Sequence, residues 1–108
     1  MKVRFSEQAI RCRVARAELE SLLAGRALVL EVGLPRGHVF RMSVGPSPLN
    51  QWQLDSDPTG YWLTIPRREL EALRDSLPSR EGLQKSFELL DGGSVQVSFE
   101  VDVKDRGD

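Results

Sequence analysis

The chain has 108 residues, of which 40% are hydrophobic and 29% charged, and its formal net charge is −1. This length and composition favour one soluble globular domain with a modest core, and the near-neutral charge argues against a dedicated nucleic-acid-binding protein. No apolar run approaches the roughly 20 residues that span a bilayer, the first residues lack the apolar core of a secretory signal, and the single cysteine excludes a disulfide framework. We therefore expect a cytoplasmic protein without membrane association.

The first half of the chain predicts the order strand, strand, helix, strand, strand. Apolar and polar residues alternate in the strand segments, which is typical of strands with one solvent-facing side, and leucines at helical spacing mark the helix. The predicted strands cover residues 2–5, 10–14, 28–32 and 38–44, and the predicted helix covers residues 16–24. In the hairpin formed by the first two strands, Ile10, Cys12 and Val14 are expected to face inward.

The second half repeats this order after a short, rigid connection at residues 45–48, which contains two prolines. Its predicted strands cover residues 50–55, 61–65, 85–90 and 94–103, and its predicted helix covers residues 66–77. Pro66 suits the first helical position, where a missing N–H loses no partner, and Pro78 ends the helix. Trp52 in the first of these strands and Val103 in the last are expected to face inward.

The two halves also match residue by residue in the strand–helix unit. Residues 51 positions apart correspond as Val14 with Ile65, Glu18 with Glu69, Leu19 with Leu70 and Leu22 with Leu73. We predict a single α+β domain, mainly antiparallel, with about eight strands and two helices in duplicated ββαββ halves (1–45 and 49–103) related by pseudo-two-fold symmetry. Either a barrel-like sheet or a curved sheet packed on the helices fits. The barrel is favoured, because eight short strands in an open sheet leave edges to protect.

The charges are divided unequally between the halves. Residues 1–54 carry 8 basic and 4 acidic side chains, and residues 55–108 carry 7 basic and 12 acidic ones. The cations expected to face outward from the first half's strands are Lys2, Arg4, Arg11, Arg13 and Arg41. The first four would form a patch able to bind a small anion, an acidic protein or a phosphate backbone. The alternative is a solvated face paired with Glu31 and with acids of the second half.

The outward acids of the second half are Asp55, Glu88, Glu100 and Asp102. They form either a solvated face or the counterpart of the basic patch in a homodimer held by oppositely charged faces. Trp62 is expected to face outward near the arginines. It is either an interface anchor or core beneath a covering element.

No catalytic, metal or cofactor motif is present. His38 has no partner at ligand or triad spacing, so neither a metal site nor a catalytic base is supported. Cys12 is expected to pack as a small apolar side chain. No glycine-rich phosphate loop precedes a helix. We expect no cofactor and no bound metal.

The N-terminal quarter resembles a family of small uncharacterised bacterial proteins. Those proteins begin with a short strand, then an Ile-Arg-x-Arg strand, then a helix with the pattern Glu-aliphatic-x-x-Leu. The matching residues are Val3, Ile10, Arg11, Arg13, Glu18, Leu19 and Leu22. The resemblance implies a bacterial cytoplasmic protein and no assigned activity.

The sequence thus favours a non-enzymatic binding or protein-interaction module that uses the basic strand face. One alternative is a small-ligand barrel, with modest catalysis, whose pocket lies between the halves. That pocket would be lined by Tyr61, Trp52, Met42 or His38. Weak nucleic-acid binding is a third interpretation.

Overall fold

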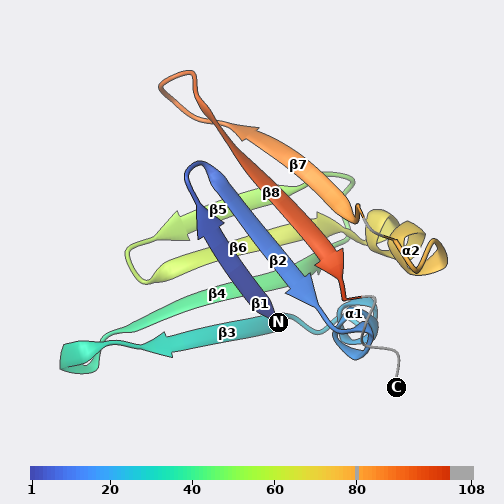
Figure 1. The fold of residues 1–108 in the computed structure, drawn as a ribbon, viewed down its shortest axis with the longest axis horizontal. Helices are drawn as coiled ribbons and strands as arrows, with labels where there is room; N and C mark the ends of the chain where they lie inside the picture. The colour runs from blue at the N-terminus through green and yellow to red at the C-terminus, as the bar shows by residue number, and fades with distance from the viewer. Residues whose placement is uncertain (80, 103–108) are drawn as a thin grey trace.

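The computed structural model describes residues 1–79 and 81–102, and it places eight strands in two four-stranded sheets (Figure 1). Sheet A contains, in spatial order, β1 (Lys2–Ser6), β2 (Ala9–Val14), β8 (Ser94–Val101) and β7 (Leu83–Glu88). Sheet B contains β3 (Leu28–Gly33), β4 (Val39–Ser47), β6 (Gly60–Pro66) and β5 (Gln53–Asp57). The helices are α1 (Arg16–Leu23) and α2 (Arg67–Asp75), and a 3-10 turn, η1 (Pro35–Gly37), precedes β4. The predicted α+β domain with eight strands and two helices is confirmed.

Each sheet is built from two antiparallel hairpins joined by a parallel pair. In sheet A the parallel pair is β2 with β8, where Cys12 lies opposite Phe99. In sheet B it is β4 with β6, where Val44 lies opposite Leu63. The chain order therefore sends one hairpin of each half into each sheet. The prediction of a mainly antiparallel fold missed these two parallel pairs.

The predicted barrel-like closure is wrong, and so is the alternative of one curved sheet over the helices. The two sheets remain separate and open, with β1 and β7 at the edges of one and β3 and β5 at the edges of the other. They cover each other's apolar face, as the contact of Phe5 with Tyr61 across the interface illustrates. The apolar faces are thus buried by stacking the two sheets, so neither sheet needs to close into a barrel. The helices contact each other at one end of the stack (Figure 1).

The core draws on both sheets and both helices. Alternation turns one side of each central strand inward, and the helices add leucines at helical spacing. The residues with less than 2% exposure are Phe99, Leu19, Leu22, Leu63, Ile65, Leu70, Val14, Val44, Val97, Pro66 and Cys12. The expected inward Val103 lies outside the described residues.

Several predicted boundaries differ from the structure. Pro66 is the last residue of β6 instead of the first helical residue, and α2 covers Arg67–Asp75 in place of residues 66–77. β7 covers Leu83–Glu88 in place of residues 85–90.

β4 extends through Ser47, so most of the segment assigned to a connection is strand. Pro46 is tolerated there because pairing with β3 stops at Val44, which leaves this part of β4 with a free side. Trp52 precedes β5 instead of lying in it, and its indole Nε1 donates a hydrogen bond to Glu69 Oε2 at 3.0 Å.

Candidate functional site

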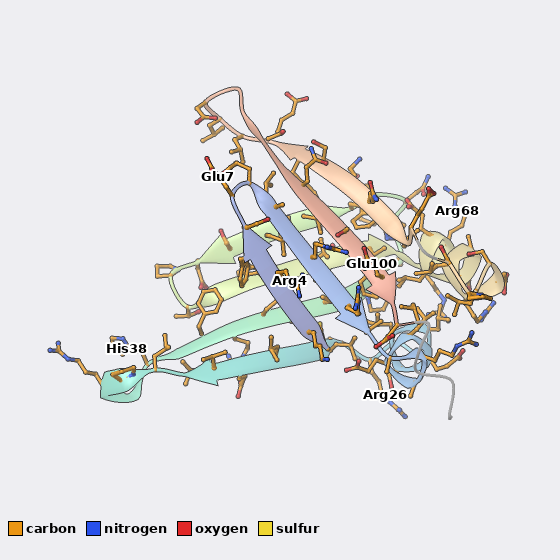
Figure 2. All side chains as sticks on the ribbon, in the orientation of Figure 1. Arg4, Glu7, Arg26, His38, Arg68 and Glu100 are labelled. Carbon is orange, nitrogen blue, oxygen red and sulfur yellow. The ribbon has the colours of Figure 1, made fainter. Side chains whose placement is uncertain are left out.

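Four cations gather on the solvent-facing side of sheet A. Lys2 and Arg4 come from β1, and Arg11 and Arg13 from β2, because the alternate residues of these strands turn inward. The antiparallel register sets Lys2 opposite Arg13 and Arg4 opposite Arg11. All four residues are exposed. We call these four residues the basic face; Figure 2 marks Arg4 within it.

Glu100 of β8 is the carboxylate nearest to this face in register, because it lies opposite Arg13 in the parallel pair. Its Oε2 accepts a hydrogen bond from Arg11 Nη2 at 3.1 Å, and its Oε1 accepts one from Arg13 Nη2 at 3.4 Å. The Glu100 side chain is only 15% exposed. Lys2 and Arg4 have no ion pair among the described residues. Glu100 is thus shared by two of the four cations, and Asp102 lies beside Lys2 and Arg13 at one end of the face.

The basic face also forms a shallow surface depression of about 260 Å³. Its walls are Lys2, Val3, Arg4, Arg11, Arg13 and Glu100. Pockets for drug-sized ligands start at about 300 Å³ and enclose most of the ligand. This open depression suits a single anionic group, such as a carboxylate or a phosphate.

Removing the Glu100 carboxylate should destabilise the fold through the cations that it holds. We expect Glu100→Gln to lower the free energy of unfolding by about 1 kcal/mol at low salt, because like charges opposed across a ladder then repel without a counter-ion. The difference from the wild type should shrink as salt screens both effects. Urea denaturation at low and high sodium chloride concentrations measures this difference in the free energy of unfolding.

Glu31→Gln is the matched control, because Glu31 pairs with Arg41 at 2.6 Å on a half-exposed surface. Its effect should stay within about 0.5 kcal/mol. A Glu100→Gln effect equal to that of the control would show that Glu100 does not hold the face together.

The other two outward residues of the predicted binding surface, Arg41 and Trp62, lie on sheet B. Arg41 is on β4 and faces outward from sheet B beside Glu31. Trp62 is on β6, where its outward side chain is 41% exposed and has Ser43 and Asp55 as register neighbours. The structure thus resolves the core-or-surface question for Trp62 in favour of the surface. It also separates Trp62 from the basic face, since the outer sides of the two sheets point in opposite directions.

The acids of the second half are not gathered into one surface. Asp55 lies on sheet B, whereas Glu88 and Glu100 lie on sheet A, and Glu100 pairs with Arg11 and Arg13. Asp102 follows β8, and its backbone N–H donates to the carbonyl of Val14. The pairing of outward arginines with acids of the second half is therefore present, and Glu100 makes it with both Arg11 and Arg13.

The side chains considered for catalysis or for an internal pocket are either packed or isolated. Met42, Trp52 and Tyr61 belong to the apolar core, and His38 is exposed just after the η1 turn (Figure 2). Burial raises the pKa of the Cys12 thiol to about 12, and burial together with the neighbouring Cys12 also raises the pKa of Tyr61. Neither group ionises near neutral pH, which makes both poor nucleophiles.

Within residues 1–79 and 81–102, no three His, Cys, Asp or Glu side chains are grouped so that they could hold a metal ion. In the same part of the chain, neither helix has the length and apolar character needed to cross a bilayer. The basic face is therefore the best-supported candidate site.

A scan against protein-family models finds no match for this chain, and searches of curated proteins and of solved structures find no similar chain.

Proposed function

We propose that this protein is a non-enzymatic binding module whose basic face takes an acidic segment of a partner protein. The observation that carries the proposal is the register of β1 and β2, which sets cation directly opposite cation twice. Like charges directly opposite each other destabilise a ladder. An anion bound between these cations would relieve their repulsion, which favours binding at this face.

The chemistry of the face favours a ligand with carboxylate or phosphate groups, and the size of the face favours a peptide. Arginine guanidinium groups donate paired hydrogen bonds to carboxylate or phosphate oxygens, and Lys2 and Arg4 have no ion pair with described residues. The footprint is short, because Glu88 lies on the same side of the same sheet and the net charge of the chain is −1. A short acidic peptide segment fits this footprint better than an extended nucleic-acid backbone does.

Fluorescence anisotropy with a labelled Asp/Glu-rich peptide tests the proposal at low salt. We expect Lys2→Gln/Arg4→Gln to weaken binding about ten-fold or more, because it removes the two cations that are free to pair with a ligand. The matched control is Arg26→Gln/Arg68→Gln, which removes the same charge from exposed positions near the helices (Figure 2). The control should change the affinity by less than about two-fold.

Competition experiments with other anions distinguish between the classes of ligand. Pyrophosphate that displaces the peptide at a similar concentration would identify a small-anion site with the same chemistry. A single-stranded oligonucleotide of equal charge that binds more tightly than the peptide would replace the proposal with nucleic-acid binding. No peptide binding at low salt, or equal loss in both double variants, would overturn the proposal.

We also infer that the two ββαββ halves arose by duplication and that the protein works in a reducing cytoplasm. The first inference is supported by the equivalent registers of the two parallel pairs. Ile10 lies opposite Val97 as Tyr61 lies opposite Met42, and Cys12 opposite Phe99 as Leu63 opposite Val44. The second is supported by the single cysteine, which is buried and free.

A further inference from the structure

The four edge strands differ in how they are protected against pairing with another chain. Lys2 and Arg4 put charge on the β1 edge, and β5 is short and carries Asp55 and Asp57. On the β7 edge, Lys85 lies opposite the buried Val97, so this lysine is on the inner side of the sheet. Edge charges, short strands and inward-pointing charges are the devices that prevent edge-to-edge association.

The fourth edge, β3, has almost none of this protection. Its sequence is Leu-Val-Leu-Glu-Val-Gly, and its one charge, Glu31, is already paired with Arg41 of the neighbouring β4. β3 runs along the free side of sheet B, and no other described strand or helix lies along its outer edge (Figure 1). Its backbone groups on that side are therefore available to a further strand.

Exposed apolar side chains also gather at this edge. Nine large hydrophobic residues of the described chain are exposed, and three of them, Val29, Val32 and Leu34, lie in β3 or directly after it. A fourth, Val39, begins the paired strand β4 opposite Gly33. Exposed apolar groups beside unpaired backbone mark a protein-interaction edge.

We propose that β3 pairs antiparallel with β3 of a second copy of this chain, with Leu30 opposite Leu30 of that copy. In this register Leu28 to Val32 pair with the same five residues of the second strand, and only Gly33 lies beyond its end. The inner side presents only apolar pairs, namely Leu30 with its copy and Leu28 with Val32 in both directions. On the outer side Val29 lies opposite Glu31. A two-fold axis relates the strands, so the contact closes as a dimer and does not extend.

The strand sequence favours this register over its neighbours. Residues directly opposite each other point to the same side of a sheet, so only registers centred on a residue preserve the inward and outward sides. Centring on Glu31 would oppose two carboxylates, which is unfavourable. Centring on Val29 would leave Glu31, Val32 and Gly33 without a partner in the second strand, and centring on Val32 would do so for Leu28, Val29 and Leu30. The strand is thus self-complementary on its inner side, and this is why we assign the edge to a second copy of the chain.

The dimer does not depend on the binding role of the basic face, which lies on sheet A. It also differs from a dimer held by oppositely charged faces. Backbone hydrogen bonds and apolar rungs hold it, so its dissociation constant should change little with salt, whereas a charge-paired dimer would dissociate.

Sedimentation equilibrium of the whole chain at low and high salt tests the proposal. We expect the wild type to be a dimer at both. Val32→Lys should be a monomer, because it places an ammonium group opposite Leu28 of the partner strand. Val32 is 48% exposed, so the fold should tolerate the change, and circular dichroism checks this. The control is Leu90→Lys, which adds the same charge at a fully exposed leucine of the β7–β8 connection, outside sheet B, and should stay dimeric.

Oxidative cross-linking tests the register separately. A cysteine at position 30 would face its copy about 4.5–5.5 Å away between Cα atoms, within disulfide range. A cysteine at position 29 would be about 8 Å from its copy, which is too far. We expect Leu30→Cys to cross-link and Val29→Cys not to. The wild-type chain should not cross-link, since Cys12 is 0% exposed.

Three results would overturn the proposal: a wild type that stays monomeric at its highest soluble concentration, a dimer that dissociates with salt, or a Val32→Lys variant that remains dimeric. Cross-linking of Val29→Cys in place of Leu30→Cys would overturn the register.

Discussion

Gly60→Ala should lower the free energy of unfolding by at least about 3 kcal/mol. Gly60 begins β6 with a φ of +150°, a conformation that L side chains rarely adopt, and a Cβ atom there would lie 1.8 Å from the carbonyl oxygen of Arg41. Arg41 belongs to β4, the parallel partner of β6. The clash is between backbones, so the central pair of sheet B must separate to relieve it. Urea denaturation followed by circular dichroism measures the loss.

Gly33→Ala is the control for this prediction. Gly33 lies in β3, and a Cβ atom there would meet no other atom within 4 Å. The variant should match the wild type or gain up to about 1 kcal/mol, because alanine restricts the unfolded chain. If Gly60→Ala unfolded at the same urea concentration as Gly33→Ala, the close approach of β4 and β6 described above would be wrong.

Phe99→Ala should cost about 3–5 kcal/mol, through lost apolar burial and the cavity that remains. Phe99 is 0% exposed and lies in β8, opposite Cys12 of β2 on one side and Leu83 of β7 on the other. Its side chain therefore supports the middle of sheet A. Since domains of this kind are stable by about 5–15 kcal/mol, the variant should retain only a small part of its stability.

The control for Phe99→Ala is Leu90→Ala, because Leu90 is fully exposed in the β7–β8 connection. Its free energy of unfolding should lie within about 0.5 kcal/mol of the wild-type value. If the free energy of unfolding of Phe99→Ala were as close as this to the wild-type value, either the cavity would collapse without loss of stability or β8 would not pack as described.

Local patterns were sufficient to predict the helices, strands and hairpins, but not which hairpins lie side by side in a sheet. Alternation located each hairpin, because a strand with one buried side must place Ile10, Cys12 and Val14 on it. The parallel pairing of β2 with β8 leaves no such local trace, since residues far apart in sequence form it. Because those parallel pairs were not foreseen, the eight strands were assigned to one sheet, and a barrel was predicted so that this sheet would have no free edges. Stacking of two open sheets depends on the connections between strands, which alternation does not encode.

The same limit applies to the site. The four cations could be predicted because the β1–β2 hairpin is local and its register follows from the alternation. Glu100 could not be assigned to them, because its position depends on the register between β2 and β8. Trp62 was placed near the arginines by analogy between the halves. The analogous strand, β6, is in the other sheet, so equivalent positions face opposite sides of the molecule.

The exchange of hairpins between sheets also determines when the chain can fold during synthesis. Cys12 and its cross-strand neighbour Phe99 are separated by 87 positions, so sheet A needs both ends of the chain. When the ribosome has delivered the first half, β2 and β4 both still lack the strand that will become their parallel neighbour. Neither half can therefore reach its final structure alone, and closing such long loops makes folding slow. The nascent N-terminal half must stay soluble with its apolar strands unpaired, which is the stage at which chaperones act.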